Sequence, residues 1–459
     1  MEYPPSETLD IKAKLKNNGL DIFVGNKKFA IDYPTAIWQK TPSIVRQALL
    51  ENITFAETHL LPLILNKKKI KYNFNYPLFE PYLFKNQLYD LIYCEKIDEI
   101  KKPLSYLQKF YNLDFEFSSP DSTIPGPTDI PKLKFTKTKA IIPFTFGKES
   151  LVTFSLCREL GIEPILFYCQ EPVQPYEEKY KLKRLAELEK KFKVKTYFIK
   201  HEPGLFRYGR AFNTPAHSEL GWGSQTTILA LLAIPFLYAE QARYILFSSE
   251  ASTAQADGLI NGWKVFNSAD ETIENSILKN NICRLLTNNQ SEVKCLLEPL
   301  EEIEIFYLLH HRYPEIGQQQ FSCFAEKPLY PGSQWCHNCT KCQRMFVFAR
   351  ACGLDPQKIG FKKDILQSSG YFKHYFDNKD TLATDQELDF IFYLLSKKGL
   401  TSPYIKKFQK ERLPKLRSWN WYHNYYSGIK SSINLPAPYR NKIIKIFSQE
   451  MANFEKRIS

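Results

Sequence analysis

The sequence comprises 459 residues with a formal net charge of +13, and 44% of its residues are hydrophobic. This length allows two or three domains, and the composition is typical of a soluble globular protein. No run of about 18 apolar residues occurs, so no membrane span is expected, and 10 cysteines in so long a chain exclude a disulfide-rich scaffold.

Residues 1–117 are rich in Tyr, Phe and Lys, and we predict an N-terminal α+β domain there. The chain begins without an apolar signal-peptide region, so a cytoplasmic protein is expected. Aromatic residues are dense at 72–84, and we expect them to lie in the core. Residues 118–134 contain four prolines and one glycine, which predicts a linker.

From residue 135 onwards, short apolar runs alternate with helical patterns. The expected strands are 139–146, 163–170, 193–200 and 243–250, and the expected helices are 148–160, 175–192 and 224–242. This alternation predicts an α/β domain over 135–320, in which helices cover both faces of a parallel sheet. Such sheets bind ligands beyond the carboxyl ends of their strands.

The stretch PFTFGKES, residues 143–150, lies at such a strand end. The first N–H groups of the following helix lack partners and carry the positive end of its dipole. Gly147 allows close approach of the backbone, Lys148 adds a cation, and Thr145 and Ser150 add hydroxyls. These features suit a phosphate group, although a plain strand–turn–helix connection would have the same pattern.

The stretch resembles the PP-loop of ATP pyrophosphatases, in the adenine nucleotide alpha hydrolase-like (HUP) superfamily. The usual Ser-Gly-Gly-x-Asp-Ser becomes Thr145, Phe146, Gly147, Lys148, Glu149 and Ser150 here. Thr145 keeps the hydroxyl of the usual serine. Phe146 replaces a glycine and could narrow the space for the phosphate group. Glu149 replaces an aspartate, so its acidic side chain is one methylene longer. The resemblance implies that ATP is cleaved to AMP and pyrophosphate, which activates a carboxylate or carbonyl oxygen of a small-molecule acceptor as an adenylate.

The resemblance also implies a set of site residues with ATP and Mg²⁺ as cofactors. Catalytic roles are expected for Lys148, Glu149 and Ser150. ATP binding is expected from Thr145, Phe146, Gly147, Lys148, Ser150, Glu171, Ser249 and Glu250, and Asp257 is a further candidate. For the residues after the second and fourth strands, a surface polar role at a strand end is an equal alternative.

Four cysteines cluster late in the chain with the spacing C-x12-C-x2-C-x2-C: Cys323, Cys336, Cys339 and Cys342. Four thiolates favour Zn²⁺ or an iron–sulfur cluster, and a closed four-ligand site predicts a structural zinc element, which we place at 321–360. His337 could replace one cysteine. The other six cysteines are expected to be ordinary core thiols.

This cysteine pattern, with Arg344 and the GLDP segment at 353–356, is similar to that of 7-cyano-7-deazaguanine synthase, a PP-loop enzyme. A larger part of the chain, about 140–355, resembles the UDP-N-acetylmuramoyl-L-alanyl-L-glutamate epimerase family, through SSEAS at 248–252, EPLEEIEIF at 298–306 and WCHNCTKC at 335–342. The chain departs from that family in the PP-loop and at 264–270, so the reaction class transfers better than the substrate.

Residues 361–459 are predicted to form a basic, aromatic-rich helical extension. Basic and aromatic residues together can bind nucleic acid, so a tRNA-modifying PP-loop enzyme is one alternative. A helical appendage that packs its aromatic residues on the core is another. A third is a non-catalytic binding protein whose loop has decayed. The favoured hypothesis is an AMP-forming, adenylating enzyme of ligase or epimerase type.

Overall fold

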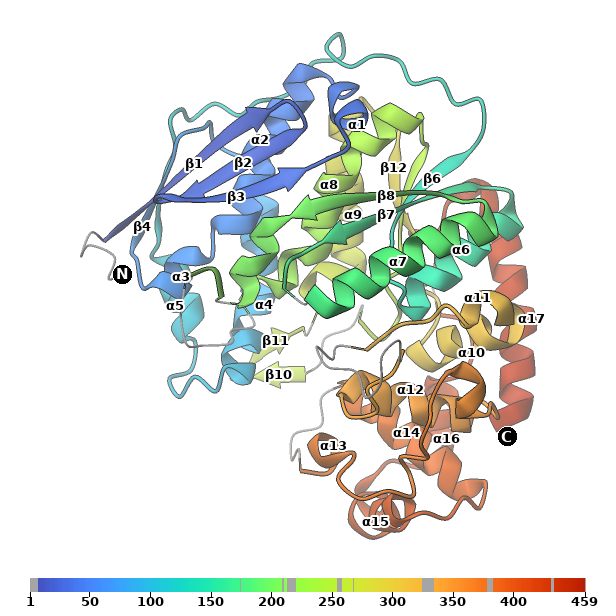
Figure 1. Cartoon of the computed structure of the whole chain (residues 1–459). Coiled ribbons are helices and arrows are strands. Elements are labelled where there is room, and N and C mark those ends of the chain that lie inside the picture. The colour runs from blue at the N-terminus through green and yellow to red at the C-terminus, as the bar shows by residue number, and fades with distance from the viewer. Residues whose placement is uncertain are drawn as a thin grey trace.

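The computed structural model describes residues 7–173, 175–208, 210–212, 220–253, 258–266, 268–323, 334–377, 383–430 and 433–458. A large sheet with helices on both sides forms the upper part in Figure 1, and a smaller helical part lies below it. The protein is therefore α/β, as the alternation of elements predicts.

The sheet has ten strands, most of which are parallel to their neighbours. They are β1 (Thr8–Lys16), β2 (Gly19–Val24), β3 (Lys27–Asp32), β4 (Lys69–Tyr72), β5 (Asp114–Glu116), β6 (Lys139–Pro143), β7 (Glu163–Gln170), β8 (Lys195–His201), β9 (Tyr244–Phe247) and β12 (Glu292–Cys295). Their order across the sheet is β12-β9-β6-β7-β8-β3-β2-β1-β4-β5. The chain runs outward from β6 to β8 and then returns to β9 on the other side of β6, so the strand order reverses between β6 and β9.

Side chains of the central strands alternate between two cores, because successive residues of a strand point to opposite faces. Ala140 and Ile142 join one hydrophobic core, whereas Ile141 between them joins the other. All three are fully buried. Both faces of these strands are therefore covered, which explains why they read as continuous apolar runs.

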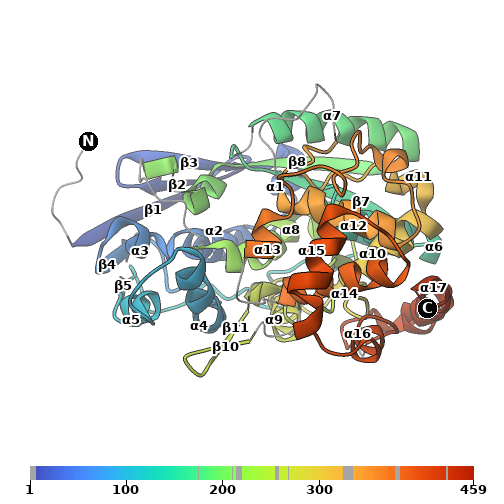
Figure 2. The same cartoon turned by 90° about the horizontal axis from the view of Figure 1, so that it is seen from below.

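Different helices cover the two faces, and Figure 2 shows α7 on one side of the sheet and α2 on the other. The first core contains α6 (Lys148–Leu160), α7 (Pro175–Phe192), α10 (Glu302–Arg312), α12 (Thr340–Ala351), α14 (Ala383–Lys397) and α17 (Arg440–Ile458). The second contains α2 (Ser43–Thr58), α8 (Gln225–Glu240) and α9 (Ile273–Leu286). Shorter or peripheral helices are α1 (Thr35–Gln39), α3 (Leu61–Leu65), α4 (Glu80–Ile97), α5 (Ser105–Tyr111), α11 (Pro314–Gly317), α13 (Lys373–Asp377), α15 (Pro403–Glu411) and α16 (Trp419–Tyr425).

The N-terminal strands extend the sheet of the following segment. β3 pairs antiparallel with β8, through Ile31 opposite His201 and Asp32 opposite Lys200. Residues 118–134 have no regular secondary structure and connect β5 at one edge of the sheet with β6, the third strand from the other edge. Ile130 and Leu133 within this segment are buried, so the linker packs on the protein.

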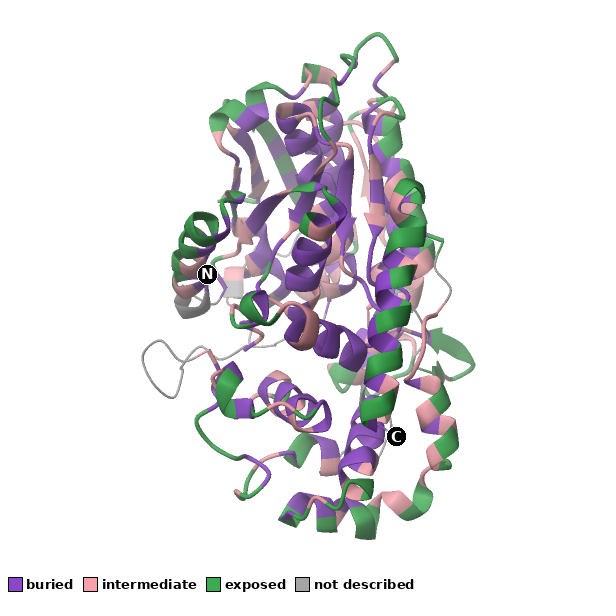
Figure 3. Ribbon diagram, turned by 90° about the vertical axis from the view of Figure 1, so that its right-hand side faces the viewer, coloured by how far each residue is buried: buried purple, intermediate pink, exposed green. Residues whose placement is uncertain are grey.

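The C-terminal helices belong to the first core and supply many of its aromatic side chains. Phe408, Tyr422, Phe447 and Phe454 are all buried there. One side of α17 is buried and the other is exposed, as Figure 3 shows beside the C-terminus. This arrangement agrees with the alternative in which the extension packs its aromatic residues on the core.

The elements expected between residues 139 and 250 are present, although β6 and β9 each end three residues before the predicted strands, and Gly161, whose φ is +75°, is the C-cap of α6. Elements that were not predicted include β12, α9, and a hairpin of β10 (Gly258–Ile260) and β11 (Trp263–Val265). The segment Trp222–Glu240, which contains α8, is long and apolar enough to cross a membrane, but 72% of its apolar window is buried within the fold. It is a core helix, as expected.

Candidate functional site

The loop at residues 143–150 joins the carboxyl end of β6 to α6. Its turn is made by Phe146, whose φ is +62°, and not by Gly147, whose φ is −65° at the N-cap of α6. A left-handed conformation is unfavourable for a bulky residue. Phe146 is fully buried against Phe144, with ring centroids 4.8 Å apart, and its backbone oxygen accepts a hydrogen bond from the Phe321 N–H at 2.9 Å. Packing therefore holds this turn.

Hydroxyl groups at both ends of the loop brace its backbone. The Ser150 hydroxyl donates to the Gly147 carbonyl at 3.1 Å, and the Thr145 N–H donates to the Ser150 hydroxyl at 3.4 Å. The Gly147 N–H donates to the Thr145 hydroxyl at 3.4 Å. A Cβ atom at Gly147 would lie 2.9 Å from a Glu149 oxygen and 3.3 Å from the Thr145 hydroxyl. A larger residue here would therefore displace the end of the Glu149 side chain, and the φ angle of Gly147 does not itself require a glycine.

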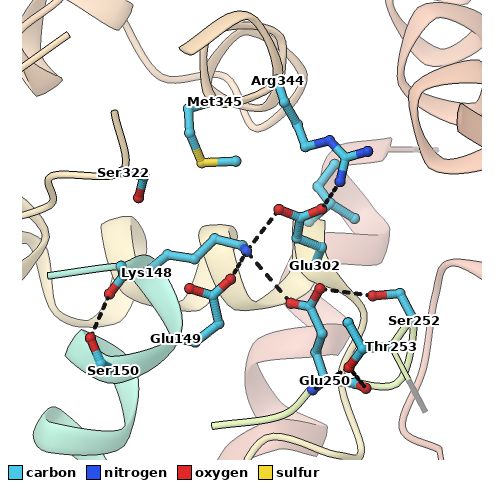
Figure 4. Close-up of polar contacts among 12 residues, drawn as sticks. Lys148, Glu149, Ser150, Glu250, Ser252, Thr253, Glu302, Ser322, Arg344 and Met345 are labelled. Atoms are coloured by element: carbon cyan, nitrogen blue, oxygen red, sulfur yellow. Dashed lines mark hydrogen bonds and ion pairs between the residues drawn. The ribbon is translucent and has the colours of Figure 1, made fainter. Parts of the chain in front are cut away.

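Lys148 lies among three carboxylates, as Figure 4 shows. Its Nζ is 2.8 Å from Glu302 and 3.5 Å from Glu250, and it also pairs with Glu149. The Lys148 side chain is only 2% exposed. Burial alone would lower the pKa of Lys148, but these carboxylates raise it well above its ordinary value, so the side chain is a buried cation.

Glu302 is the anionic centre of this group. It begins α10, where the helix dipole favours a negative charge, and it pairs with both Lys148 and Arg344 of α12. Burial would raise the pKa of Glu302, but Arg344 and Lys148 hold that pKa well below its usual range. Glu302 therefore stays ionised.

Glu250, three residues after the end of β9, has the opposite tendency. Burial, together with the nearby charges of Glu302 and Glu149, raises its pKa from 4.5 to about 8, against the lowering effect of Lys148. One of its oxygens, Oε2, is buried without a hydrogen bond, whereas the other accepts from the Ser252 hydroxyl at 2.9 Å. Two carboxylates that share one cation thus have pKa values pushed apart, a pattern typical of functional sites.

A cavity of about 470 Å³ opens beside these residues, at the point where the strand order reverses. This is the position at which open α/β sheets bind ligands, and its size is that of a small-molecule site. Polar lining comes from the α6 N-terminus and the end of β9, and apolar lining includes Tyr168, Val173, Trp222 and Leu229. Phe146 is not among the residues that the structure describes as lining the cavity. Its ring therefore does not narrow the space that the loop offers to a phosphate group.

The remaining predicted nucleotide-binding residues also lie at this cavity. Glu171 and Ser249 both line it. Glu171 is paired with Arg207 and lies 3.3 Å from Nδ1 of His201, so its carboxylate is held by the protein. Asp257 lies outside the described residues.

The four predicted cysteines converge on one point. The sulfur atoms of Cys323 and Cys339 are 4.0 Å apart, and those of Cys336 and Cys342 are 3.7 Å apart. Thiolates about 2.3 Å from a central ion in tetrahedral geometry lie about 3.8 Å apart, so this group could hold a metal ion such as zinc. His337 is not part of the group: its Nε2 accepts from the Lys362 N–H at 2.9 Å.

The cysteine group is connected to the cavity through α12. Cys339 caps the N-terminus of α12, its sulfur accepting from the Cys342 N–H at 3.5 Å. The first two turns of this helix carry Lys341, which lines the cavity, and Arg344, which pairs with Glu302. A metal ion held by the four cysteines would thus fix the direction from which these two cations approach the site.

The central role of Glu302 could not be read from the local sequence. It lies 154 residues from its partner Lys148, in the acidic run EPLEE, where Glu301 and Glu304 form a capping box. That capping box marks the start of a helix. A carboxylate at the start of a helix that follows a strand was therefore the signal from which Glu302 could have been predicted as a site residue. Glu387 of α14, which accepts from the Ile303 N–H at 2.8 Å, was also missed.

Comparison with known protein families finds none that matches this chain, and comparison with curated proteins finds no similar sequence.

Proposed function

We propose that this protein is an ATP pyrophosphatase of the PP-loop type. In the proposed reaction, an oxygen of a carboxylate or carbonyl acceptor forms a bond to the α-phosphorus of ATP. The bond between that phosphorus and the bridging oxygen breaks, and pyrophosphate leaves. The acceptor is then an adenylate, from which AMP is released in a later step.

One observation carries this proposal: a helix N-terminus with a buried lysine opens onto a cavity at the point where the parallel strand order reverses. The N–H groups of the first turn of α6 and the dipole of that helix suit phosphate oxygens. The apolar side chains around Tyr168 and Trp222 provide a surface for a flat base. Five strands in the order β8-β7-β6-β9-β12 support the resemblance to the superfamily.

The carboxylates of the site are suited to a magnesium ion that accompanies the nucleotide. Oxygen atoms of Glu149, Glu250 and Glu302 lie within 4.8 Å of one another, and Mg²⁺ prefers oxygen ligands shared with phosphates. When bound, Mg²⁺ would neutralise charge on the phosphates and on the leaving pyrophosphate. Lys148 would supply a second positive charge, and Ser150 would keep the loop in its braced conformation.

The test is product formation from ATP and Mg²⁺ by the purified chain, with and without a small-molecule cell extract. We expect AMP and pyrophosphate that depend on the extract and disappear in Ser150→Ala. Ser155→Ala is the matched control, because Ser155 is also a buried serine of α6 that donates to a backbone carbonyl, that of Leu151 at 2.7 Å. Lys148→Ala is less informative because it leaves buried carboxylates without their cation.

Intact ATP with no measurable ATP binding would refute the proposal and favour the decayed-loop alternative. Intact ATP with clear binding would indicate that the acceptor is missing. In that case tRNA is the next acceptor to add, with binding measured over a range of salt concentrations. Equal activity of Ser150→Ala and Ser155→Ala would show that the Ser150 hydroxyl in this loop is not needed for the reaction.

A further inference from the structure

A second group of metal-binding side chains lies beside the same cavity, at the ends of two neighbouring strands. Cys169 belongs to β7, Glu171 follows two residues later, and His201 ends β8, which is parallel to β7. One ligand atom from each of these residues lies within 4.8 Å of the others. Cys169 and Glu171 both line the cavity. This group is separate from the four clustered cysteines and from Glu149, Glu250 and Glu302.

His201 is oriented as a ligand would be. Its ring is only 1% exposed, and Nε2 lies 2.6 Å from an oxygen of Glu57 in α2. The other ring nitrogen, Nδ1, is buried without a hydrogen bond and lies 3.3 Å from Glu171. A histidine that binds a metal with one nitrogen almost always donates from the other to a carboxylate or carbonyl. Glu57 occupies that supporting position.

The surrounding charges are compatible with a divalent cation. Arg207, in the turn after β8, pairs with Glu171 and is buried. As metal ligands, Cys169 would be a thiolate and His201 would be neutral, so Cys169, Glu57 and Glu171 would carry three negative charges against the single positive charge of Arg207. A divalent ion would make this group neutral, which a buried site requires because an uncompensated charge is costly there.

We propose that Cys169, Glu171 and His201 bind a divalent metal ion of the zinc class. Sulfur, imidazole and carboxylate together are the donors of zinc sites, whereas Mg²⁺ and Ca²⁺ take oxygen ligands. Three protein ligands leave a fourth position open, as in catalytic zinc sites, and two of these ligands line the cavity. The open position would take a water molecule or an oxygen of the acceptor. This site does not depend on the identity of the nucleotide.

The test is metal content of the full chain after reconstitution with zinc alone and removal of free metal. We expect Cys169→Ala to bind about one zinc ion fewer per chain than the wild type. Cys157→Ala, which removes a buried cysteine of α6, is the matched control and should bind as the wild type does. Thermal melts establish that each variant is folded. With Co²⁺, the difference spectrum between the wild type and Cys169→Ala should be that of a site with a single thiolate.

A second variant tests the supporting carboxylate. Glu57→Gln keeps an acceptor for the His201 N–H but removes the charge, and we expect zinc affinity at this site to fall about 10- to 100-fold. Equal zinc content in the wild type and in folded Cys169→Ala would overturn the proposal. Rapid alkylation of Cys169 that zinc does not slow would also overturn it, and would indicate a cysteine nucleophile beside His201.

Discussion

Replacing Glu250 by glutamine should change how stability depends on pH. The pKa of Glu250 is raised from 4.5 to about 8 in the folded protein, first by burial. Between these values the folded chain binds a proton that the unfolded chain releases, so the free energy of unfolding of the wild type decreases as pH rises. At about 1.4 kcal/mol per pKa unit, a shift of this size lowers the free energy of unfolding of the wild type by about 5 kcal/mol between pH 4.5 and pH values above 8.

Glu250→Gln removes this titration while keeping the shape of the protonated side chain. We therefore expect the variant and the wild type to have similar stability near pH 5, and the variant to be more stable by several kcal/mol near pH 9. The assay is urea unfolding at intervals of pH, followed by circular dichroism. Other buried acids with raised pKa values, such as Glu271 and Glu301, are present in both proteins and cancel in the comparison.

Glu159→Gln is the matched control, because its pKa shift has the opposite sign. Arg312 lies 2.6 Å from Glu159 and lowers its pKa. The stabilisation that ionised Glu159 provides is thus already complete above pH 4.5. The variant should therefore be less stable than the wild type by a constant amount from pH 5 to 9. A constant difference for Glu250→Gln as well would refute the reasoning, since it would show that Glu250 is ionised throughout this range.

Three other substitutions test separate parts of the structure. Cys339→Ser should release about one zinc ion per chain and lower the melting temperature; an iron–sulfur absorption band in the wild type would contradict zinc. Phe146→Gly relieves a left-handed phenylalanine, worth about 1 kcal/mol, but loses a buried ring worth about 3–5 kcal/mol. It should therefore destabilise the protein and leave ATP affinity unchanged. A large change in ATP affinity, measured by calorimetry, would show that the ring contributes to the phosphate-binding site. Phe454→Ala in α17 should cost about 3–5 kcal/mol in chemical unfolding, because this ring is buried against Tyr307 with centroids 5.2 Å apart; a negligible cost would favour a detached nucleic-acid-binding tail.

The sequence predicted most accurately the parts of the fold that are determined locally. The strand at 163–170 and the helix at 175–192 have the predicted bounds, because apolar runs and amphipathic spacing are local signals. The cysteine group was predictable for the same reason: three of its four members lie within seven residues, 336–342. The pairing of β3 with β8 was not predictable, since strand partners far apart in sequence leave no local pattern.

The candidate site was predicted only in part, for a related reason. Lys148, Ser150 and Glu250 each follow or precede a recognisable strand or helix, so their approach to one sheet edge could be inferred. Which charges meet there could not, because Glu302 and Arg344 reach the site from α10 and α12. The orientation of Phe146 was also not predictable: the resemblance to the PP-loop implied that this ring could narrow the phosphate-binding loop, whereas it packs against Phe144 in the core.

The buried charges themselves are an argument that this edge of the sheet has a function. Glu302 is 2% exposed and Glu387 1%, and both lie among apolar side chains of α10 and α14. Well-packed hydrophobic residues are often at least as stabilising as a buried ion pair of similar volume. Stability alone therefore does not explain Lys148, Glu302 and Arg344 at one point, contributed by three helices. Lys148 and Glu302 line a cavity where the strand order reverses, and Arg344 pairs with Glu302, an arrangement that is explained if these charges act on a ligand.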